Sequence, residues 1–183
     1  MIVYIQKVFM KLYKILTQKP CVRVLKKWGL NVGKNLNVQN YSSIDISHCW
    51  LISIGDNVTL APYAQILAHD ASTYKFLGYT KIGKVEIGNN VFIGAGAIVL
   101  PNVKIGDNVI VGAGSVVTKN LPDNSVCGGI PCVKICDLNE YIKKIENIPE
   151  ELRYDKSYHY NKITKEQKVK MIKDLNNNMG LIV

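Results

Sequence analysis

Three histidines are the side chains of this chain best suited to accepting a proton at neutral pH, because an unperturbed imidazole has a pKa of about 6.5. One of them, His69, lies in the segment 68–81, where a regular sequence repeat breaks off. Segments that project from a rigid scaffold frequently carry the chemistry of an enzyme. We therefore expect His69 to act as a general base. Asp70 follows it directly and is a candidate for orienting the imidazole, for shaping the loop or for touching an acceptor.

The other two histidines have weaker claims on catalysis. His48 lies beside Trp50 in a shorter irregular segment, where we expect a surface histidine and a tryptophan on which a sugar ring can stack. His159 lies in a polar stretch near the C-terminus and is expected to be inert. Tyr74 and Tyr79, both in the segment 68–81, are candidates for lining an acceptor site.

The cysteines do not suggest a metal site. They form an odd, scattered set with no CxxC pair: Cys21, Cys49, Cys127, Cys132 and Cys136. Cys132 and Cys136 have helical spacing but lack the two further ligands of a structural zinc site. We therefore expect no metal, reduced cysteines and a cytoplasmic location.

A period of six residues dominates the middle of the chain. From Ile87 to Pro122 it reads IGNNVF, IGAGAI, VLPNVK, IGDNVI, VGAGSV and VTKNLP, and each block begins with an aliphatic residue. Neither a helical period nor a long alternating strand explains this pattern. A short strand followed by a tight turn does, and three such units close one triangular coil. Stacked coils form a parallel β-solenoid, in which Asn89-Asn90 and Asp107-Asn108 supply turn residues that tolerate left-handed backbone angles.

The same register recurs less regularly before Ile87. It is interrupted near His48 to Trp50, fails after Ile66 and is expected to resume at Ile82. The organisation is therefore an N-terminal helical segment over 1–30, a β-helix domain over 31–136 with a projecting loop over 68–81, and a C-terminal helical extension over 137–183. Within this extension, Thr164 and Gln167 have the spacing of a helix capping box.

The N-terminal segment, 1–16, has an apolar stripe with lysines opposite, which favours packing on the solenoid or a neighbouring subunit. Peripheral contact with the inner face of a membrane is the alternative. It has no features of a signal peptide, and no apolar run of about 18 residues indicates a spanning helix.

The net charge of +9 suits an anionic partner. The lysines are spread over both ends of the chain, and no nucleic-acid-binding motif accompanies them, so we do not expect nucleic acid as a partner.

The run IGNNVFIGAGAIVLPNVKIGDNVIVGAGSVVTKNLPDNSVCGGIPC resembles the hexapeptide-repeat acetyltransferases, in particular the maltose, galactoside and capsular-sugar O-acetyltransferases. The resemblance implies a mainly β fold, a left-handed parallel β-helix with short helices at both ends. It also implies a homotrimer with acetyl-CoA in the groove between neighbouring subunits. The histidine that deprotonates the acceptor hydroxyl in this family corresponds to His69.

The resemblance also assigns cofactor and acceptor positions. The thioester carbonyl would accept hydrogen bonds from the backbone amides of Gly94 and Ala95. The rest of the cofactor would lie along Gly112, Ala113, Thr118, Lys119 and Lys134. Lys134 stands one position later than the basic residue usual in relatives. Where galactoside-type relatives offer an asparagine to the acceptor, this chain has Tyr41, Ser42, Ser43 and Asp45, and of these Ser43 and Asp45 are candidate acceptor contacts.

The expected activity is transfer of an acetyl group from acetyl-CoA to a sugar hydroxyl, in the assembly of cell-surface polysaccharide. The alternatives are a xenobiotic or serine-type O-acetyltransferase, and a non-catalytic scaffold protein of the same fold. A γ-type carbonic anhydrase is excluded, because it needs three zinc-binding histidines and only His48 and His69 lie in the solenoid region.

Overall fold

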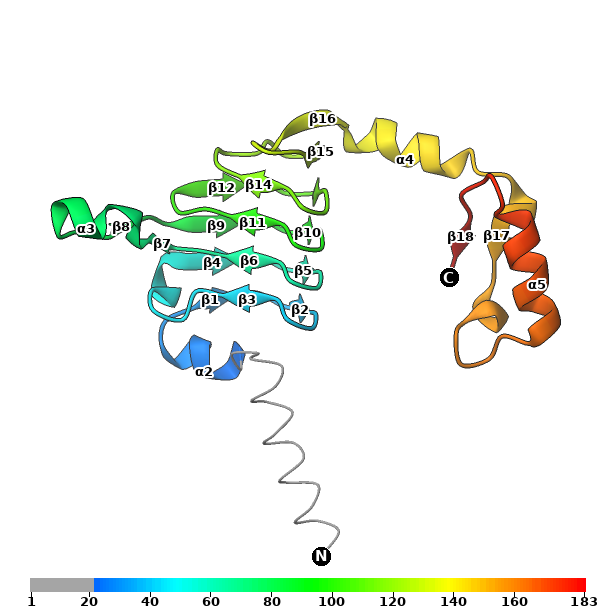
Figure 1. Ribbon diagram of the computed structural model, residues 1–183, viewed down its shortest axis with the longest axis horizontal. Helices are drawn as coiled ribbons and strands as arrows, with labels where there is room; N and C mark the ends of the chain where they lie inside the picture. The colour runs from blue at the N-terminus through cyan, green and yellow to red at the C-terminus, as the bar shows by residue number, and fades with distance from the viewer. Residues whose placement is uncertain (1–21) are drawn as a thin grey trace, which may run out of the picture. The chain divides into compact units, whose positions relative to one another are not determined.

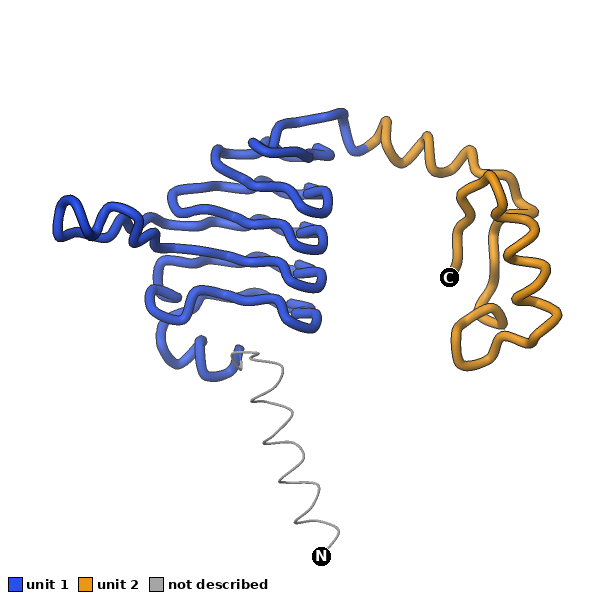
Figure 2. The backbone as a smooth tube through the Cα atoms, in the orientation of Figure 1, with its two compact units in different colours: residues 1–138 blue, residues 139–183 orange. Residues whose placement is uncertain are grey.

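The computed structural model describes residues 22–183. The helix predicted over 1–16 lies outside the described residues. The chain divides into two compact units, 1–138 and 139–183, which Figure 2 shows in different colours.

The first unit is a left-handed parallel β-helix, as the six-residue period predicts. Short strands stack into three parallel sheets, one on each side of the coil (Figure 1). Sheet 1 contains β1 (Asn31–Val32), β4 (Ile52–Ile54), β9 (Val85–Ile87) and β12 (Val103–Ile105). Sheet 2 contains β2 (Asn37–Val38), β5 (Thr59–Leu60), β10 (Phe92–Ile93), β13 (Val109–Val111), β15 (Ser125–Gly128) and β16 (Val133–Asp137). Sheet 3 contains β3 (Ser43–Ile44), β6 (Gln65–Ile66), β11 (Ile98–Val99) and β14 (Val116–Val117).

The aliphatic residue that opens each hexapeptide forms the core. In sheet 1, Ile54 pairs with Ile87 and Ile87 with Ile105, so the same side of each strand faces inward at every coil. All the corresponding positions are buried: Ile54, Ile87, Ile105, Leu60, Ile93, Val111, Ile66, Val99 and Val117. Full burial of an aliphatic side chain stabilises a fold by about 1.5–3 kcal/mol, so these internal ladders hold the coils together.

Asparagine forms a second ladder at the turns that lead from sheet 1 to sheet 2. Asn57, Asn90 and Asn108 have φ angles of 57°, 54° and 57°, as expected for residues that tolerate left-handed backbone. The side-chain Nδ2 of Asn57 donates to Oδ1 of Asn90 over 3.0 Å, and Nδ2 of Asn90 donates to Oδ1 of Asn108 over 2.9 Å. Each turn is thereby fixed to the turn of the next coil.

The outer faces of the three sheets differ in polarity. The outward column of sheet 1 is polar and contains Ser53, Glu86 and Lys104. The outward column of sheet 2 is apolar in the later coils, where Phe92, Ile110 and Val126 are paired in register. In sheet 3 the outward column changes from Ser43 and Gln65 to Ile98 and Val116 along the stack.

Different elements close the two ends of the stack. Helix α2 (Val22–Lys27) lies beside the first coil and buries Leu25 in the core (Figure 1). At the other end β16 runs antiparallel to β15, whereas the other strand pairs of the three sheets are parallel.

One excursion leaves the coil after β6. It contains β7 (His69–Asp70), the 3-10 helix η2 (Ala71–Thr73), α3 (Tyr74–Leu77) and β8 (Lys81–Ile82), and it projects as a hairpin (Figure 1). The expectation that the repeat resumes at Ile82 is wrong. Ile82 pairs antiparallel with His69 and is 59% exposed, and the buried ladder resumes at Val85 in β9.

The second unit has its own small set of elements. They are α4 (Leu138–Glu146, which begins in the last residue of the first unit), η3 (Glu150–Leu152), β17 (Arg153–Tyr154), η4 (Lys156–Tyr158), α5 (Lys165–Asp174) and β18 (Leu181–Ile182). The predicted capping box is present: the Gln167 amide donates to Thr164 Oγ1, and the Thr164 amide donates to Gln167 Oε1. Over 22–183 we find no helix with the length and apolar character needed to cross a membrane.

Candidate active site

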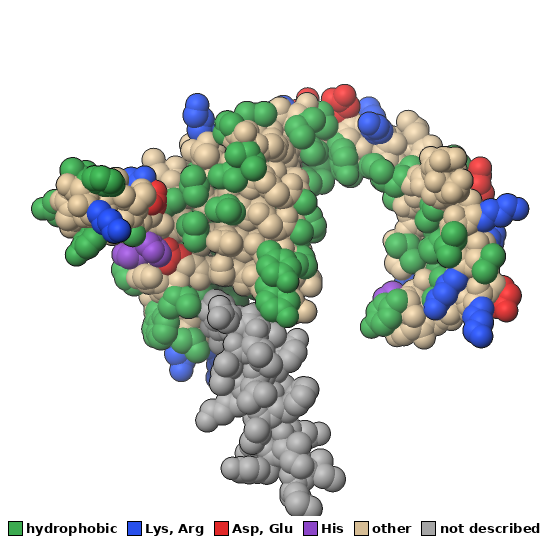
Figure 3. All heavy atoms as spheres, in the orientation of Figure 1, with side chains coloured by type: hydrophobic (Ala, Val, Ile, Leu, Met, Phe, Trp, Pro, Cys, Tyr) green, Lys and Arg blue, Asp and Glu red, His purple; other side chains and the backbone are tan. Residues whose placement is uncertain are grey.

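The site is built around His69, the first residue of the hairpin. Its Nδ1 lies 2.5 Å from Oδ2 of Asp45, which follows β3 on the preceding coil. The Asp45 side chain is 1% exposed and the His69 side chain 34% exposed. A buried carboxylate therefore holds an imidazole whose other edge is open to a substrate. Figure 3 shows histidine side chains gathered at the base of the projecting hairpin.

The surroundings of Asp45 determine which imidazole nitrogen is free. Burial, the largest effect, would raise the pKa of Asp45, but hydrogen bonds from His69 and from the Ala68 and His48 amides outweigh it and lower this pKa. Asp45 is consequently ionised near neutral pH and can only accept hydrogen bonds. Nδ1 of His69 must then carry the proton, which leaves the lone pair of Nε2 available as a base.

The pKa of Asp45 leads to a prediction about stability. Because this pKa lies below its ordinary value of 3.8, the unfolded state binds more protons below about pH 4. The stabilisation is complete above the unfolded-state pKa and is lost as pH falls through the folded-state pKa. We expect the destabilisation caused by Asp45→Asn, measured by denaturant unfolding, to shrink as pH is lowered from about 7 to about 2.5. A constant difference across this range would contradict the assignment.

His48 lies next to the catalytic candidate. Its ring centroid is 5.2 Å from that of His69 and 5.3 Å from that of Trp50. Trp50, in η1 (Cys49–Leu51), is 57% exposed. The buried Nδ1 of His48 has no hydrogen-bond partner among the described residues. The irregular segment between β3 and β4 thus places the exposed ring of Trp50 beside His48, which in turn lies beside His69.

The Asp70 carboxylate does not form a hydrogen bond or ion pair with the His69 ring. Its carboxylate forms an ion pair with Lys81 over 2.6 Å and accepts a hydrogen bond from the Ser72 amide. Lys81, the largest cause, lowers the pKa of Asp70 to about 2. The carboxylate that orients the imidazole is therefore Asp45, and Asp70 joins the two strands of the hairpin and caps η2.

The remaining acceptor candidates are exposed or half-buried side chains on the hairpin and on β3. Tyr74 and Tyr79 are 61% and 77% exposed on the hairpin. Ser43 is half-buried in β3, two residues before Asp45, with its side chain on the outer face of sheet 3.

The cofactor candidates fall on two edges of the solenoid. Gly94–Ala95 and Gly112–Ala113 occupy stacked turns between sheets 2 and 3, and a Cβ at Gly94 would lie 2.5 Å from the Ala113 nitrogen. The expected role of the Gly94 amide as a donor to the thioester is wrong, because this amide donates to the Val111 carbonyl over 2.8 Å. The Ala95 amide has no bond to another described residue, and it is the free donor of this turn.

The two lysines among the cofactor candidates differ in whether they have an ion-pair partner. Thr118 and Lys119 are exposed in the turn after β14, and Lys119 has no ion-pair partner in the part of the chain that the structure describes. Lys134 instead pairs with Asp137 over 2.6 Å, which raises the pKa of Lys134. Lys119 is therefore the more available cation.

Ligand atoms of Asp45, His48 and His69 lie within 4.8 Å of one another, an arrangement that the spacing of these residues in the sequence did not reveal. Divalent metals accept carboxylate and imidazole ligands. The direct contact between Asp45 and His69, however, is that of a hydrogen-bonded pair, and the chemistry of the site follows from this pair.

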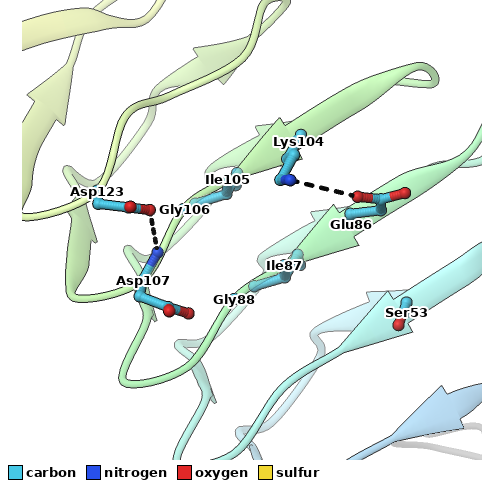
Figure 4. Close-up of a pocket in the computed structure, with 9 residues that line it drawn as sticks. All are labelled: Ser53, Glu86, Ile87, Gly88, Lys104, Ile105, Gly106, Asp107 and Asp123. Atoms are coloured by element: carbon cyan, nitrogen blue, oxygen red, sulfur yellow. Dashed lines mark hydrogen bonds and ion pairs between the residues drawn. The ribbon is translucent and has the colours of Figure 1, made fainter.

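A separate hollow of about 410 Å³ lies on the outer face of sheet 1 (Figure 4). Its carboxylates are occupied: Glu86 lies 3.9 Å from Lys104, Asp123 accepts from the Asp107 amide, and Asp107 accepts from the Asn89 amide. These bonds join neighbouring coils, and the hollow contains none of the site residues predicted from the sequence.

Comparison with known proteins adds independent information. Residues 84–119 match the family model described as bacterial transferase hexapeptide (six repeats). Protein CapG of Staphylococcus aureus is 38% identical over 164 residues, which cover 85% of this chain and 90% of CapG.

Two further proteins are similar over a shorter region. The galactoside O-acetyltransferase of Escherichia coli (strain K12) is 34% identical over 123 residues, which cover 62% of this chain and 57% of that enzyme. A solved structure of a galactoside acetyltransferase in complex with coenzyme A is 29% identical with a TM-score of 0.56, and the match covers 66% of this chain and 71% of that one. The chain therefore spans most of CapG but less than two thirds of the Escherichia coli enzyme.

Proposed function

This chain belongs to the hexapeptide-repeat family of acyl-CoA-dependent acetyltransferases, and we propose that it transfers the acetyl group of acetyl-CoA to a sugar hydroxyl. The observation that carries the proposal is the contact between Asp45 and His69 at the base of the hairpin. It holds the imidazole with Nε2 free, which is the arrangement that base-catalysed attack of a hydroxyl requires.

The reaction proceeds by direct transfer. Nε2 of His69 removes the hydroxyl proton while the acceptor oxygen attacks the thioester carbonyl carbon. The tetrahedral intermediate then collapses, the C–S bond breaks, and the imidazolium returns its proton to the leaving thiolate. Asp45 stabilises the imidazolium that exists between these two steps.

The Ala95 amide is our proposed donor to the thioester oxygen. This N–H has no bond to another described residue and lies in a turn where glycines on both sides leave the backbone accessible. A backbone donor aimed at a developing oxyanion contributes about 2.7–4 kcal/mol to transition-state stabilisation.

We propose that the acceptor is a sugar in cell-surface polysaccharide. The exposed ring of Trp50 near His69 supports a sugar, because aromatic faces pack against the C–H faces of pyranoses. The name of the galactoside O-acetyltransferase relative supports the same class. Ser43 on the outer face of sheet 3, and Tyr74 and Tyr79 on the hairpin, are further proposed contacts.

A homotrimer is the proposed assembly. Two of the three outer faces carry apolar columns in the later coils, whereas sheet 1 is polar. Cyclic packing of three solenoids would cover the apolar faces and leave the polar one in water. Sedimentation equilibrium tests this assignment, and a stable, fully active monomer would contradict it.

The proposed location is the cytoplasm, where acetyl-CoA is available. The described cysteines are unpaired, and Cys49, Cys127 and Cys132 are buried, in keeping with a reducing compartment. Peripheral membrane attachment through 1–16 remains a proposal about residues outside the described part, and liposome flotation with and without them would test it.

An acceptor screen tests the reaction. Purified protein is incubated with acetyl-CoA and neutral sugars, serine or antibiotics, and the released thiol is measured. We expect release with one or more sugars at a rate well above the hydrolysis blank. Release with serine or antibiotics alone would establish the alternative acceptor class, and no release with any acceptor would contradict the proposed activity.

Lys119 provides a prediction about the cofactor. An exposed lysine that pairs with a CoA phosphate contributes about 0.2–1 kcal/mol, so Lys119→Ala should raise KM for acetyl-CoA by about 1.4- to fivefold. The kcat should stay unchanged, because such an interaction is equally strong in the ground state and the transition state. Lys134→Ala is the matched control and should raise KM less, since Lys134 is already paired with Asp137. An equal effect of both substitutions would contradict the assignment.

A further inference from the structure

His48 has a buried ring nitrogen that the proposed reaction does not use. Its Nδ1 is shielded from solvent, and no residue in the described part of the chain forms a hydrogen bond with it. Buried polar atoms are almost always paired, and an unpaired one indicates a water molecule or an ion as its partner. A neutral imidazole nitrogen is also the commonest metal ligand in proteins. The Nδ1 atom of His48 therefore directs attention to its neighbours as possible co-ligands.

Two such neighbours, Asp45 and His69, lie beside His48. One ligand atom from each of the three residues lies within 4.8 Å of the other two, and the two imidazole centroids are 5.2 Å apart. Zinc forms bonds of about 2.0–2.2 Å to imidazole nitrogen and carboxylate oxygen, so two ligands of one ion are at most about 4.2 Å apart. Side-chain rotations that move these atoms by less than about 1 Å would therefore place all three around one ion.

The ligand set selects the class of ion. Two imidazoles and one carboxylate suit zinc and related first-row transition metals, whereas Mg²⁺ and Ca²⁺ prefer oxygen ligands. The thiol next to His48 in the chain is engaged elsewhere, because Cys49 Sγ donates to the carbonyls of Leu25 and Trp28 over 3.7 Å each. Three protein ligands then leave the fourth position of a tetrahedral zinc ion to water.

A metal ion can reach this cluster from solvent. His48 and His69 are both half-buried, and Figure 3 shows histidine side chains at the molecular surface, at the base of the hairpin. Lys81 on the hairpin would repel a cation, but its charge is compensated by Asp70 at 2.6 Å. The cluster therefore offers an entry path as well as ligands, both of which a metal site requires.

We propose that Asp45, His48 and His69 bind one zinc-class divalent ion that inhibits acetyl transfer, an effect that rests on the proposed function. Nδ1 of His69 faces Asp45, so an ion held by both residues lies on Nδ1 and displaces its proton. That proton moves to Nε2, because a neutral imidazole carries one proton on its ring nitrogens. Nε2 then has no lone pair for the acceptor hydroxyl. The metal-free protein is the active form.

Equilibrium dialysis of the full chain against Zn²⁺ tests binding without any reaction. We expect one His48-dependent ion per chain and no comparable binding of Mg²⁺. His48→Gln should weaken this binding by about tenfold or more, since even residues that only support metal ligands contribute about 10- to 100-fold to affinity. The variant should keep a thermal midpoint near that of the wild type without metal, because Nδ1 of His48 has no hydrogen bond to a described residue that could be lost.

His159→Gln is the matched control, because it removes the one histidine outside the cluster. His159 is exposed in the second unit and is hydrogen-bonded to Asn161, so its loss should leave Zn²⁺ binding unchanged. Zn²⁺ should raise the thermal midpoint of the wild type and of His159→Gln, since an ion that binds only the folded state stabilises it. The midpoint of His48→Gln should not rise at the same Zn²⁺ concentration.

Inhibition is measured as the loss of acetylated sugar, because the thiol of released CoA itself binds zinc. Without metal, kcat of His48→Gln should stay within a few-fold of the wild-type value. Zn²⁺ should slow the wild type, and a chelator should restore its rate. His48→Gln should need about tenfold more Zn²⁺ for the same loss.

Three results would overturn the proposal. They are the absence of stoichiometric Zn²⁺ binding by the wild type, equal binding by His48→Gln and His159→Gln, and His48-dependent binding that leaves the rate of transfer unchanged. His48-dependent binding by a protein that acetylates no acceptor would support the metal site and contradict the proposed function, so the two failures are distinguishable.

Discussion

Replacing His69 with alanine is expected to lower kcat for acetyl transfer by about 10²- to 10⁴-fold, the contribution of a positioned general base. This corresponds to about 2.7–5.5 kcal/mol of activation free energy. Nε2 of the imidazole removes the hydroxyl proton. In the alanine variant no side chain linked to Asp45 can accept that proton. Steady-state kinetics with a sugar identified in the screen measures the effect.

The affinity for acetyl-CoA should change little in this variant, whereas the thermal midpoint should fall, because the buried Asp45 carboxylate loses the hydrogen bond from His69. His69 is partly exposed at the start of the hairpin and is not part of the buried ladders. His159→Ala is the control, because that side chain is exposed in the second unit and is hydrogen-bonded to Asn161. We expect its kcat to stay within a few-fold of the wild-type value. A folded His69→Ala protein with wild-type activity would refute the mechanism.

The second large effect is expected for Asp45→Asn, which should lower kcat by about 10²-fold or more. Asparagine can donate as well as accept, so it no longer obliges Nδ1 of His69 to carry the proton. The tautomer with the proton on Nε2 then becomes accessible, and that tautomer cannot act as the base. Because Asp45 acts through His69, KM for acetyl-CoA should remain near the wild-type value while kcat falls.

Asp70→Asn separates this role from a general effect of removing a carboxylate near the site. Asp70 pairs with Lys81 on the exposed hairpin and does not touch the imidazole. Its substitution should reduce kcat less than Asp45→Asn does. Stability must be measured in parallel, because Asp45 also accepts from the Ala68 and Ser47 amides. Equal losses of kcat in the two variants would contradict the assignment of Asp45.

The solenoid was predictable from sequence because its core is periodic. Each hexapeptide begins with a residue such as Ile87 or Ile105 that must face inward, so one register accounts for the whole run. Asn90 and Asn108 identified turns for an equally local reason, since few other residues adopt a positive φ without strain. The prediction was wrong at Ile82, where the antiparallel pairing of the hairpin replaced the coil.

The partner of His69 was not predictable by the same local reasoning. Asp70 is adjacent in sequence, but neighbouring side chains on a strand point to opposite faces. Asp45 comes close only because Ile44 pairs with Ile66, which brings the end of β3 beside the start of the hairpin. Counting one full coil back from His69 would have supplied the signal.

The ends of the solenoid bear on how the protein behaves at high concentration. Parallel strands stacked at one spacing have the geometry of a cross-β fibre, and an uncovered last coil would template the first coil of another molecule. Here α2 lies beside one end, and the antiparallel β16 occupies the free edge of β15 at the other. Both elements therefore limit strand pairing between molecules at the two ends of the solenoid. Variants that shorten α2 or disrupt β16 are therefore where fibrillar assembly should first emerge.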